Sequence, residues 1–230
     1  MSKLPSKSSS ADVATFLEKL ARTPAPRTGG AGRLIFAMDA TASREPSWDR
    51  ACQIQAEMFK ETAALGGLEV QLVYYRGFGE CMASKWADSA DKLLRAMTGV
   101  TCLGGATQIG RVLQHAIGET GRRKVNALVF VGDCMEEDID ELCDLAGKLG
   151  VLGVPVFVFQ EGSDAVATRA FPQIARLSGG AWCRFDEGSA QQLRELLSAV
   201  AVYAAGGRVA LAHYGKRAGG AALQIARQIK

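Results

Sequence analysis

The sequence lacks the features that mark a membrane-spanning or secreted chain. No run approaches the roughly 18–20 apolar residues that a membrane helix needs, because the longest apolar runs, at 128–131 and 151–159, are of strand length. Residues 1–11 are rich in Ser and Lys and contain no apolar core of a secretory signal. We therefore expect a cytoplasmic protein without a membrane span.

Paired cysteines are also lacking. No C-x-x-C pair occurs, so the spacing fits neither a disulfide framework nor a zinc site. Small apolar thiols in a reducing compartment are the simplest interpretation. This interpretation applies to all six cysteines, which are Cys52, Cys81, Cys102, Cys134, Cys143 and Cys183.

Basic residues are in the minority in the body of the chain, although the whole sequence has a formal net charge of +3. Residues 1–32 hold five Lys or Arg against two acids, and residues 206–230 hold five against none. The totals of 27 basic and 24 acidic residues then leave 17 against 22 for residues 33–205. An acidic body argues against specific nucleic-acid binding, and the basic ends are interpreted as solubilising tails.

From residue 33 onward, strand patterns alternate with helix patterns. Apolar or alternating stretches predict strands at 33–38, 68–75, 80–86, 125–131, 154–159 and 181–185. Helical spacing predicts helices at 46–65, 89–97, 107–119, 136–149, 164–177 and 189–205. This order predicts a doubly wound α/β fold with a mostly parallel six-stranded sheet, one antiparallel edge strand at 80–86, and helices on both faces.

We expect one domain, at 33–205, because 230 residues supply one sizeable core but too little chain for two comfortable domains. Residues 1–32 are expected to be a flexible basic segment. Within it, Val13, Phe16, Leu17 and Leu20 recur at helical spacing, which indicates a short helix at 12–21 docked on the domain. Residues 206–230 are expected to be a basic tail with a second short helix at 221–230.

Polar residues follow two of the predicted strands. Asp39, Thr41 and Ser43 follow the first strand and place a carboxylate and two hydroxyls at alternate positions of a tight loop. Asp133 follows the strand at 125–131, and Thr107 opens a helix after a Gly-Gly loop. Ligands of open parallel sheets sit outside the carboxyl ends of the strands, so we expect these five side chains to converge there.

Two carboxylates among neutral hydroxyls suit a hard cation that retains water in an octahedral shell. Mg²⁺ fits first, and Mn²⁺ or Ca²⁺ are the alternatives. Because the charge of such an ion is only partly neutralised, it can also bind an Asp or Glu carboxylate of a partner protein.

These motifs resemble the metal-ion-dependent adhesion site, or MIDAS, of von Willebrand factor A (vWA) domains. The D-x-T-x-S loop, the Thr before a helix and the strand-terminal Asp occur in the same order, and the resemblance extends over about 33–205. It implies that Asp39, Thr41, Ser43, Thr107 and Asp133 surround the ion, some through water. It also implies a non-enzymatic protein-interaction module. Bacterial cytoplasmic members work beside chaperones or ATPases, which makes these the expected partners.

The sequence departs from the family pattern at two positions. Thr41 stands where the family usually has Ser, which keeps the hydroxyl oxygen and adds a methyl group. Cys134 stands where Gly often follows the last Asp. Neither change removes a ligand atom.

Helix capping is the simpler alternative for single residues of the site. Asp39 would cap the turn that follows it, and Ser43 or Ser47 would cap the next helix. For Glu136, Glu137 and Asp138, favourable acids at the amino end of a helix are the preferred interpretation.

Enzymatic alternatives use the same residues. A metal-dependent hydrolase would activate water with the ion, although the sequence shows no general base. A phosphatase of the haloacid-dehalogenase type would need a second acid where Thr41 stands. Cys134 and His115 would make a thiolate–imidazole pair only if the fold brought them together. A metal-free scaffold that acts through the basic tails is a further alternative.

Overall fold

Buried apolar residues form the strands of a six-stranded sheet in the computed structural model, which describes residues 31–62, 65, 67–185 and 190–218. The sheet order is β3-β2-β1-β4-β5-β6, with β3 antiparallel to β2 and every other neighbouring pair parallel. The strands are β1 (Gly32–Asp39), β2 (Leu68–Arg76), β3 (Glu80–Ala83), β4 (Ala127–Gly132), β5 (Val156–Glu161) and β6 (Ala181–Phe185). The predicted six-stranded sheet with one antiparallel edge strand is confirmed.

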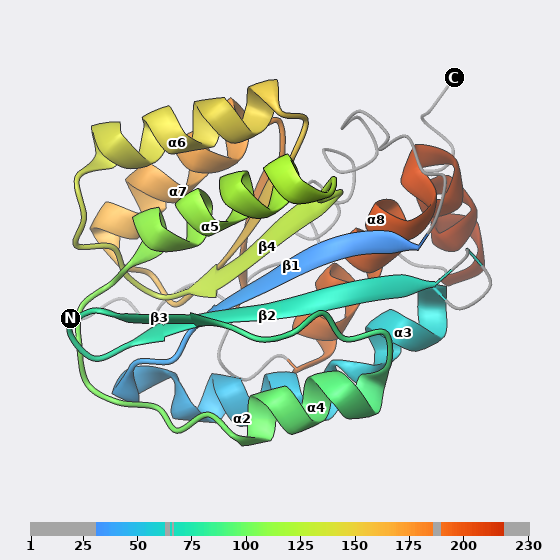
Figure 1. Cartoon of the computed structure of the whole chain (residues 1–230), viewed down its shortest axis with the longest axis horizontal. Helices are drawn as coiled ribbons and strands as arrows, with labels where there is room; N and C mark the ends of the chain where they lie inside the picture. Colours follow the sequence, from blue (N-terminus) through green and yellow to red (C-terminus); the bar gives the residue numbers. More distant parts are fainter. Residues whose placement is uncertain (1–30, 63–64, 66, 186–189, 219–230) are drawn as a thin grey trace, which may run out of the picture.

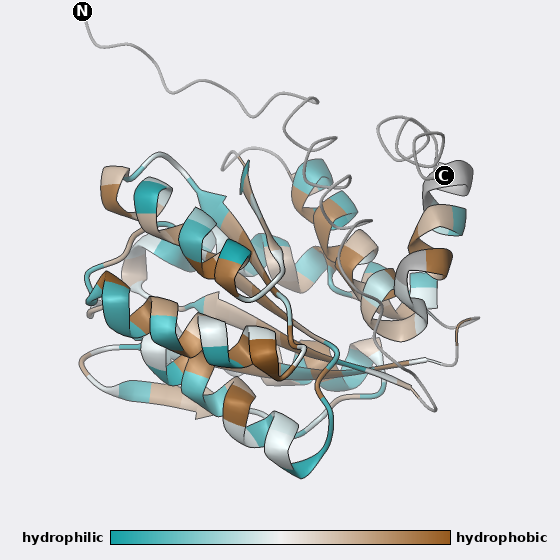
Figure 2. Cartoon of the chain, turned by 90° about the horizontal axis from the view of Figure 1, so that it is seen from above, coloured by the Kyte–Doolittle hydropathy of each residue, from teal (hydrophilic) through white to brown (hydrophobic). Residues whose placement is uncertain are grey.

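Helices cover both faces of the sheet (Figure 1). One face packs against α2 (Glu45–Ile54), α3 (Ala56–Thr62), α4 (Ala90–Thr98) and α8 (Ala190–Ala218). The other face packs against α5 (Ile109–Arg122), α6 (Ile139–Val151) and α7 (Ala165–Leu177). In Figure 2 the hydrophobic colours run along the sheet, whereas the helices carry both hydrophobic and hydrophilic residues.

Period-two alternation divides the side chains of β1 between two cores. Leu34, Phe36 and Met38 enter the core beneath α2 and α8, whereas Ile35 and Ala37 enter the core beneath α5 and α6. A strand that is buried on both faces has a continuous apolar sequence, which explains why polar residues do not alternate with apolar ones in β1. The same alternation places the side chain of the last residue, Asp39, on the α5 side.

The chain order reverses between β1 and β4. From β1 the chain continues to β2 on one side, and it later returns to β4 on the other side of β1. In doubly wound sheets this reversal leaves a crevice at the carboxyl ends of the two strands. The D-x-T-x-S loop follows β1 and Asp133 follows β4, so both lie at this point.

The structure differs from the predicted helix at 46–65. Two helices, α2 and α3, meet at the buried Gln55, and a short 3₁₀ turn (Ala42–Arg44) precedes them. The N–H of Met58 donates to the Gln55 carbonyl, 3.2 Å away, which is the tighter i+3 bond of a 3₁₀ turn. Ser47 lies inside α2 and does not cap it, so that prediction is wrong.

The last helix extends beyond the expected domain end at 205. It continues to Ala218 and bends at Gly207, whose φ of 67° suits a residue without a Cβ. Leu211, beyond the bend, is 6% exposed and belongs to the core beneath α8. Residues 206–218 are therefore structured with the domain. The predicted helices at 12–21 and 221–230 lie outside the described residues.

No helix within the described ranges is long and apolar enough to cross a membrane. All six cysteines carry free thiols.

Candidate metal centre

The loop after β1 is shaped by the carboxylate of Asp39. This side chain is 0% exposed, and its Oδ1 accepts a hydrogen bond from the N–H of Thr41, 2.7 Å away. The N–H of Arg44 donates to the Thr41 carbonyl at 2.9 Å, which closes the turn. The hydroxyl oxygens of Thr41 and Ser43 are 3.4 Å apart.

The loop after β4 is joined to this turn by one hydrogen bond. The hydroxyl of Ser43 donates to Oδ2 of Asp133 over 3.1 Å. A chain of contacts therefore links Asp39, Thr41, Ser43 and Asp133, which are four of the five predicted ligands.

One oxygen of each carboxylate has no hydrogen bond of normal geometry. Asp39 Oδ2 and Asp133 Oδ1 are both buried, and neither has such a partner among the described residues. Ligand atoms of Asp39, Asp133 and Cys134 also lie within 4.8 Å of one another. Buried polar atoms are nearly always satisfied by a partner. Two carboxylate oxygens without partners, on side chains this close together, therefore fit a bound cation.

The surroundings of Asp39 disfavour the charged form of its carboxyl group. Burial raises the pKa of this carboxyl above its ordinary value, the hydrogen bonds from Thr41 oppose the rise, and the charge of Asp133 adds to it. The hydroxyl of Tyr75, its register partner on β2, is buried beside it. Burial first, and then the Asp39 carboxylate, raise the Tyr75 pKa well above its ordinary value.

Thr107 is held against the loop that carries Asp133, through a reciprocal pair of hydrogen bonds. Its N–H donates to Oε2 of Glu136 at 3.1 Å, and its hydroxyl accepts from the N–H of Glu136 at 3.0 Å. In the described part of the chain, no hydrogen bond joins Thr107 to the other four predicted ligands. Helix α5 begins at Ile109 rather than at Thr107.

The loop before Thr107 is fixed by contacts with the residue that follows β1 and with the β2–β3 turn. The N–H of Leu103 donates to the Ala40 carbonyl at 3.0 Å, and that of Ala106 donates to the Gly77 carbonyl at 3.2 Å. A Cβ on Gly105 would lie 2.1 Å from the Gly77 oxygen, so only glycine permits this close approach. Gly105 thus serves backbone packing, which holds the loop before Thr107 against the β2–β3 turn.

The acids after Asp133 cap two different helices. Asp138 lies at the amino end of α6, as predicted, and it caps this helix because its Oδ1 accepts from two N–H groups of the first turn. Glu137 instead caps the preceding helix, α5, by accepting from the N–H groups of Ile109 and Gly110 at 2.6 and 2.8 Å. Glu136 accepts a hydrogen bond from the N–H of Thr107, so both glutamates bind backbone N–H groups at the start of α5.

A buried ion cluster that the sequence analysis missed adjoins the site. Arg44 is 2% exposed and forms an ion pair with Glu161, which ends β5 and is 1% exposed. The carboxylate also accepts from the Ser47 hydroxyl, and Arg50 Nη1 lies 3.6 Å from it. Nη1 of Arg44 is 4.0 Å from Asp133 Oδ2. The sequence gives one signal for this cluster. Glu161 ends an apolar strand, as Asp39 does, which predicts that it lies at the same carboxyl edge of the sheet.

Cys134 has a neutral thiol in this environment. Burial first, and then the adjacent Asp133, raise its pKa to about 12. His115 hydrogen-bonds through Nε2 to Oε1 of Gln71 at 2.9 Å, and burial lowers its pKa. The thiolate–imidazole pair is therefore not formed.

Replacing Glu161 tests the ion cluster. Glu161→Gln removes the carboxylate that faces Arg44 and Arg50 and leaves Arg44 only the more distant Asp133, at 4.0 Å. Breaking a buried ion pair costs about 3–5 kcal/mol. We expect this loss in the free energy of unfolding, measured by urea titration. Asp144→Asn is the control, because its pair with Lys148 is exposed and is worth at most about 1 kcal/mol. Equal losses in both variants would contradict a structural role for the cluster.

No model of a known protein family matches the sequence, and no match was found among curated proteins. Solved structures do match. The von Willebrand factor type A protein from Catenulispora acidiphila has a TM-score of 0.60 at 16% identity, over 74% of this chain and 43% of that one. The SpRpn10 VWA domain gives 0.58 at 14% identity, over 76% and 98%. Proximal thread matrix protein 1 of the mussel byssus gives 0.58 at 16% identity, over 75% and 46%.

This chain thus spans less than half of the Catenulispora protein and nearly all of the SpRpn10 domain. Identities of 14–16% establish a shared fold only. The sheet order, the two helical layers and these likenesses together identify the fold as that of a von Willebrand factor A domain.

Proposed function

We propose that this chain is a metal-dependent protein-interaction module. Asp39 and Asp133 would hold a divalent cation, with Thr41, Ser43 and Thr107 as neutral ligands, some through water. The observation that carries the proposal is a pair of buried carboxylate oxygens that have no hydrogen bond of normal geometry among the described residues. Their side chains are brought together where the chain order reverses.

The donor set favours Mg²⁺, with Mn²⁺ or Ca²⁺ as alternatives, because all five donors are oxygens. Such an ion, when bound, would supply a positive charge and would keep an open coordination position, because three of its five donors are neutral and some act through water. A carboxylate from an Asp or Glu of a partner protein would complete its shell. The burial of Asp39 and Thr41 would also shield the charge of the ion partly from water.

The surroundings favour binding over hydrolysis. Glu136 and Glu137 are the acids nearest in sequence to Asp133 on its loop, and both accept backbone hydrogen bonds at the start of α5. A general base must be able to reach the proton that it abstracts. Carboxylates used to cap a helix are poorly suited to that role, so a metal-dependent hydrolase remains the second candidate.

Exposed apolar side chains on the neighbouring loops support a protein partner. Phe78 is 92% exposed at the β2–β3 turn, and Leu103 is 46% exposed on the loop bonded to Ala40. Large apolar side chains, aromatic ones above all, are typical anchors of protein interfaces. We propose a cytoplasmic partner, such as a chaperone or an ATPase, that presents a carboxylate beside an apolar side chain.

Asp39→Asn tests the metal site. The amide keeps an oxygen for the Thr41 N–H but removes the charge, so we expect Mn²⁺ binding to be lost in isothermal titration. At free Mn²⁺ of about 100 times the Kd, the wild type should gain about 2.7 kcal/mol of unfolding free energy, and the variant none. Asp144→Asn, on the exposed face of α6, is the matched control and should bind as the wild type does.

The same variant has a defined effect without metal. Because burial raises the pKa of Asp39 in the folded state, the charged form opposes folding, and stability falls as pH rises through that pKa. In EDTA at neutral pH, Asp39→Asn should therefore be at least as stable as the wild type.

If Asp39→Asn bound Mn²⁺ with unchanged affinity, the assignment of Asp39 as a metal ligand would be refuted.

Cys134→Ser separates a hard cation from a soft one. If oxygens alone hold the ion, this variant leaves the Mn²⁺ affinity unchanged and weakens only Zn²⁺ or Cd²⁺, which thiolates prefer. Competition titrations with the three metals measure this. A loss of Mn²⁺ binding as large as that of Asp39→Asn would make the thiol a ligand and overturn the hard-cation assignment.

Capture from a lysate of the cells that make this protein tests the partner class. We expect a protein that is retained in Mn²⁺, released by EDTA and absent with Asp39→Asn. For that protein, Phe78→Ala should weaken binding by about 30-fold, as loss of an interface anchor does. Val151→Ala is the control, since Val151 is 91% exposed at the far end of α6. A partner captured equally well in EDTA would contradict the metal-dependent mechanism.

A further inference from the structure

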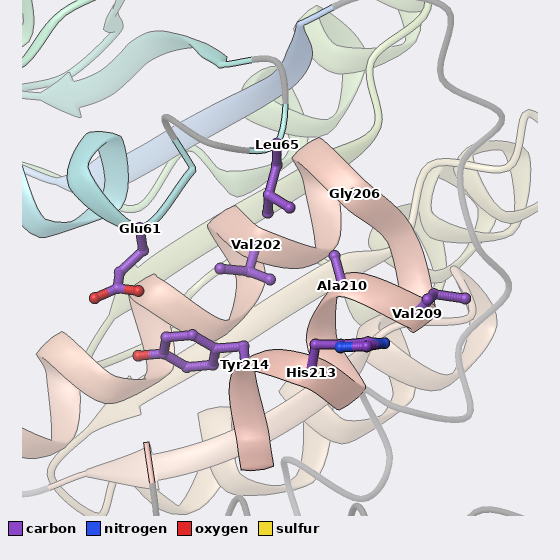
Figure 3. Close-up of a pocket in the computed structure, with 8 residues that line it drawn as sticks. All are labelled: Glu61, Leu65, Val202, Gly206, Val209, Ala210, His213 and Tyr214. Atoms are coloured by element: carbon purple, nitrogen blue, oxygen red, sulfur yellow. The ribbon is translucent and has the colours of Figure 1, made fainter. Parts of the chain in front are cut away.

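An apolar groove lies far along the chain from the metal centre, between the end of α3 and the bend of α8 (Figure 3). Its volume is about 580 Å³. Five of its eight lining residues are apolar or glycine, and these are Leu65, Val202, Gly206, Val209 and Ala210. Val209 is 71% exposed, although the next large apolar residue of the same helix, Leu211, is buried. The groove is therefore lined mainly by apolar side chains, of which Val209 is the most exposed.

The bend at Gly207 creates this groove. With φ of 67° and ψ of −162°, Gly207 interrupts the helical backbone, so the residues before and after it form separate walls. A Cβ on Gly206 would lie 2.4 Å from the Cβ of Ala210 and 3.4 Å from Leu65. Two consecutive glycines thus allow a close approach that leaves the apolar side chains of both walls facing a shared space.

The chain enters the domain at the edge of this groove. A Cβ on Gly32 would lie 2.5 Å from the carbonyl oxygen of Ala204, so the first residues of β1 pass directly over α8. A Cβ on Gly67 would lie 4.0 Å from that of Ala31. Residues 31–32 therefore run between α8 and the segment after Leu65, beside two residues that line the groove.

The sequence preceding this entry point contains one segment that matches the groove. Val13, Phe16, Leu17 and Leu20 follow the i, i+3, i+4, i+7 pattern of a helix with a single apolar face. Ten residues, 22–31, connect this segment to Gly32, and ten extended residues span up to about 33–36 Å. This length reaches any part of the groove from its edge.

We propose that residues 12–21 dock in this groove as an intramolecular strap, with the apolar stripe against the walls formed by Leu65, Val209 and Ala210. The short tether gives the segment a local concentration in the millimolar range, which makes a single apolar stripe sufficient for docking. The segment at 221–230 fits less well, because its apolar residues Leu223, Ile225 and Ile229 are spaced by two and four positions and do not form one stripe. The strap is independent of the metal centre.

Hydrogen exchange in the full chain, read by mass spectrometry on peptides covering 202–214, tests the strap. Leu17→Asp places a charge on the apolar stripe, and Thr15→Asp places the same charge on the opposite face of the predicted helix. Losing the burial of one leucine shifts the docking equilibrium by roughly tenfold or more. We therefore expect Leu17→Asp to speed exchange at 202–214 by that factor and Thr15→Asp to leave it unchanged.

A second variant changes the groove wall. Val209 is largely exposed, so Val209→Asp leaves the fold intact, and we expect it to speed exchange as Leu17→Asp does. The double variant should add nothing further, because both changes break the same contact. Equal exchange in the wild type and Leu17→Asp would overturn the strap. If exchange became faster only after deletion of residues 219–230, that segment would be the occupant of the groove. If protection depended on protein concentration, the occupant would be a second copy of the chain. Either result would also overturn the proposal.

Discussion

Two carboxylates at the junction of β1 and β4, the buried Asp39 and the partly exposed Asp133, are the constraint on which the rest of the site depends. Their like charges lie close together, and one buried oxygen of each has no hydrogen bond of normal geometry among the described residues. A fold gains nothing from this arrangement unless a positive charge completes it. Arg44 approaches Asp133 but is held by Glu161, so the nearest guanidinium is already paired. A small cation is the group that we propose for the remaining oxygens.

Much of this site could be predicted from the sequence, because it is built at strand ends. Apolar runs of strand length ended by Asp39 and followed by Asp133 show where two carboxylates meet, since parallel strands bring their carboxyl ends to one edge. The alternation of Asp39, Thr41 and Ser43 then predicts hydroxyls beside the first carboxylate, and the contacts join all four residues. The local pattern suffices here because each residue is fixed by its own strand or turn.

The rest depends on contacts between distant segments. Glu161 and Arg44 are 117 positions apart, and no local pattern predicts that a charged residue in each will be buried together. Glu137 caps α5 rather than the helix that follows it, because the loop after β4 crosses the start of the neighbouring helix. The continuation of α8 past Gly207 was also missed, since a Gly-Gly pair normally ends a helix pattern and only tertiary packing of Leu211 restores it.

A crystal structure of the protein grown with Mn²⁺ tests the central claim most directly, because anomalous scattering locates the ion without reference to any activity. The account predicts one strong anomalous peak in contact with the carboxylates of Asp39 and Asp133, with hydroxyl groups and water completing the shell. It also predicts that Thr107 lies in that shell or one water away. Ordered Asp39 and Asp133 without a peak between them, at Mn²⁺ concentrations that fill ordinary hard-cation sites, would contradict it.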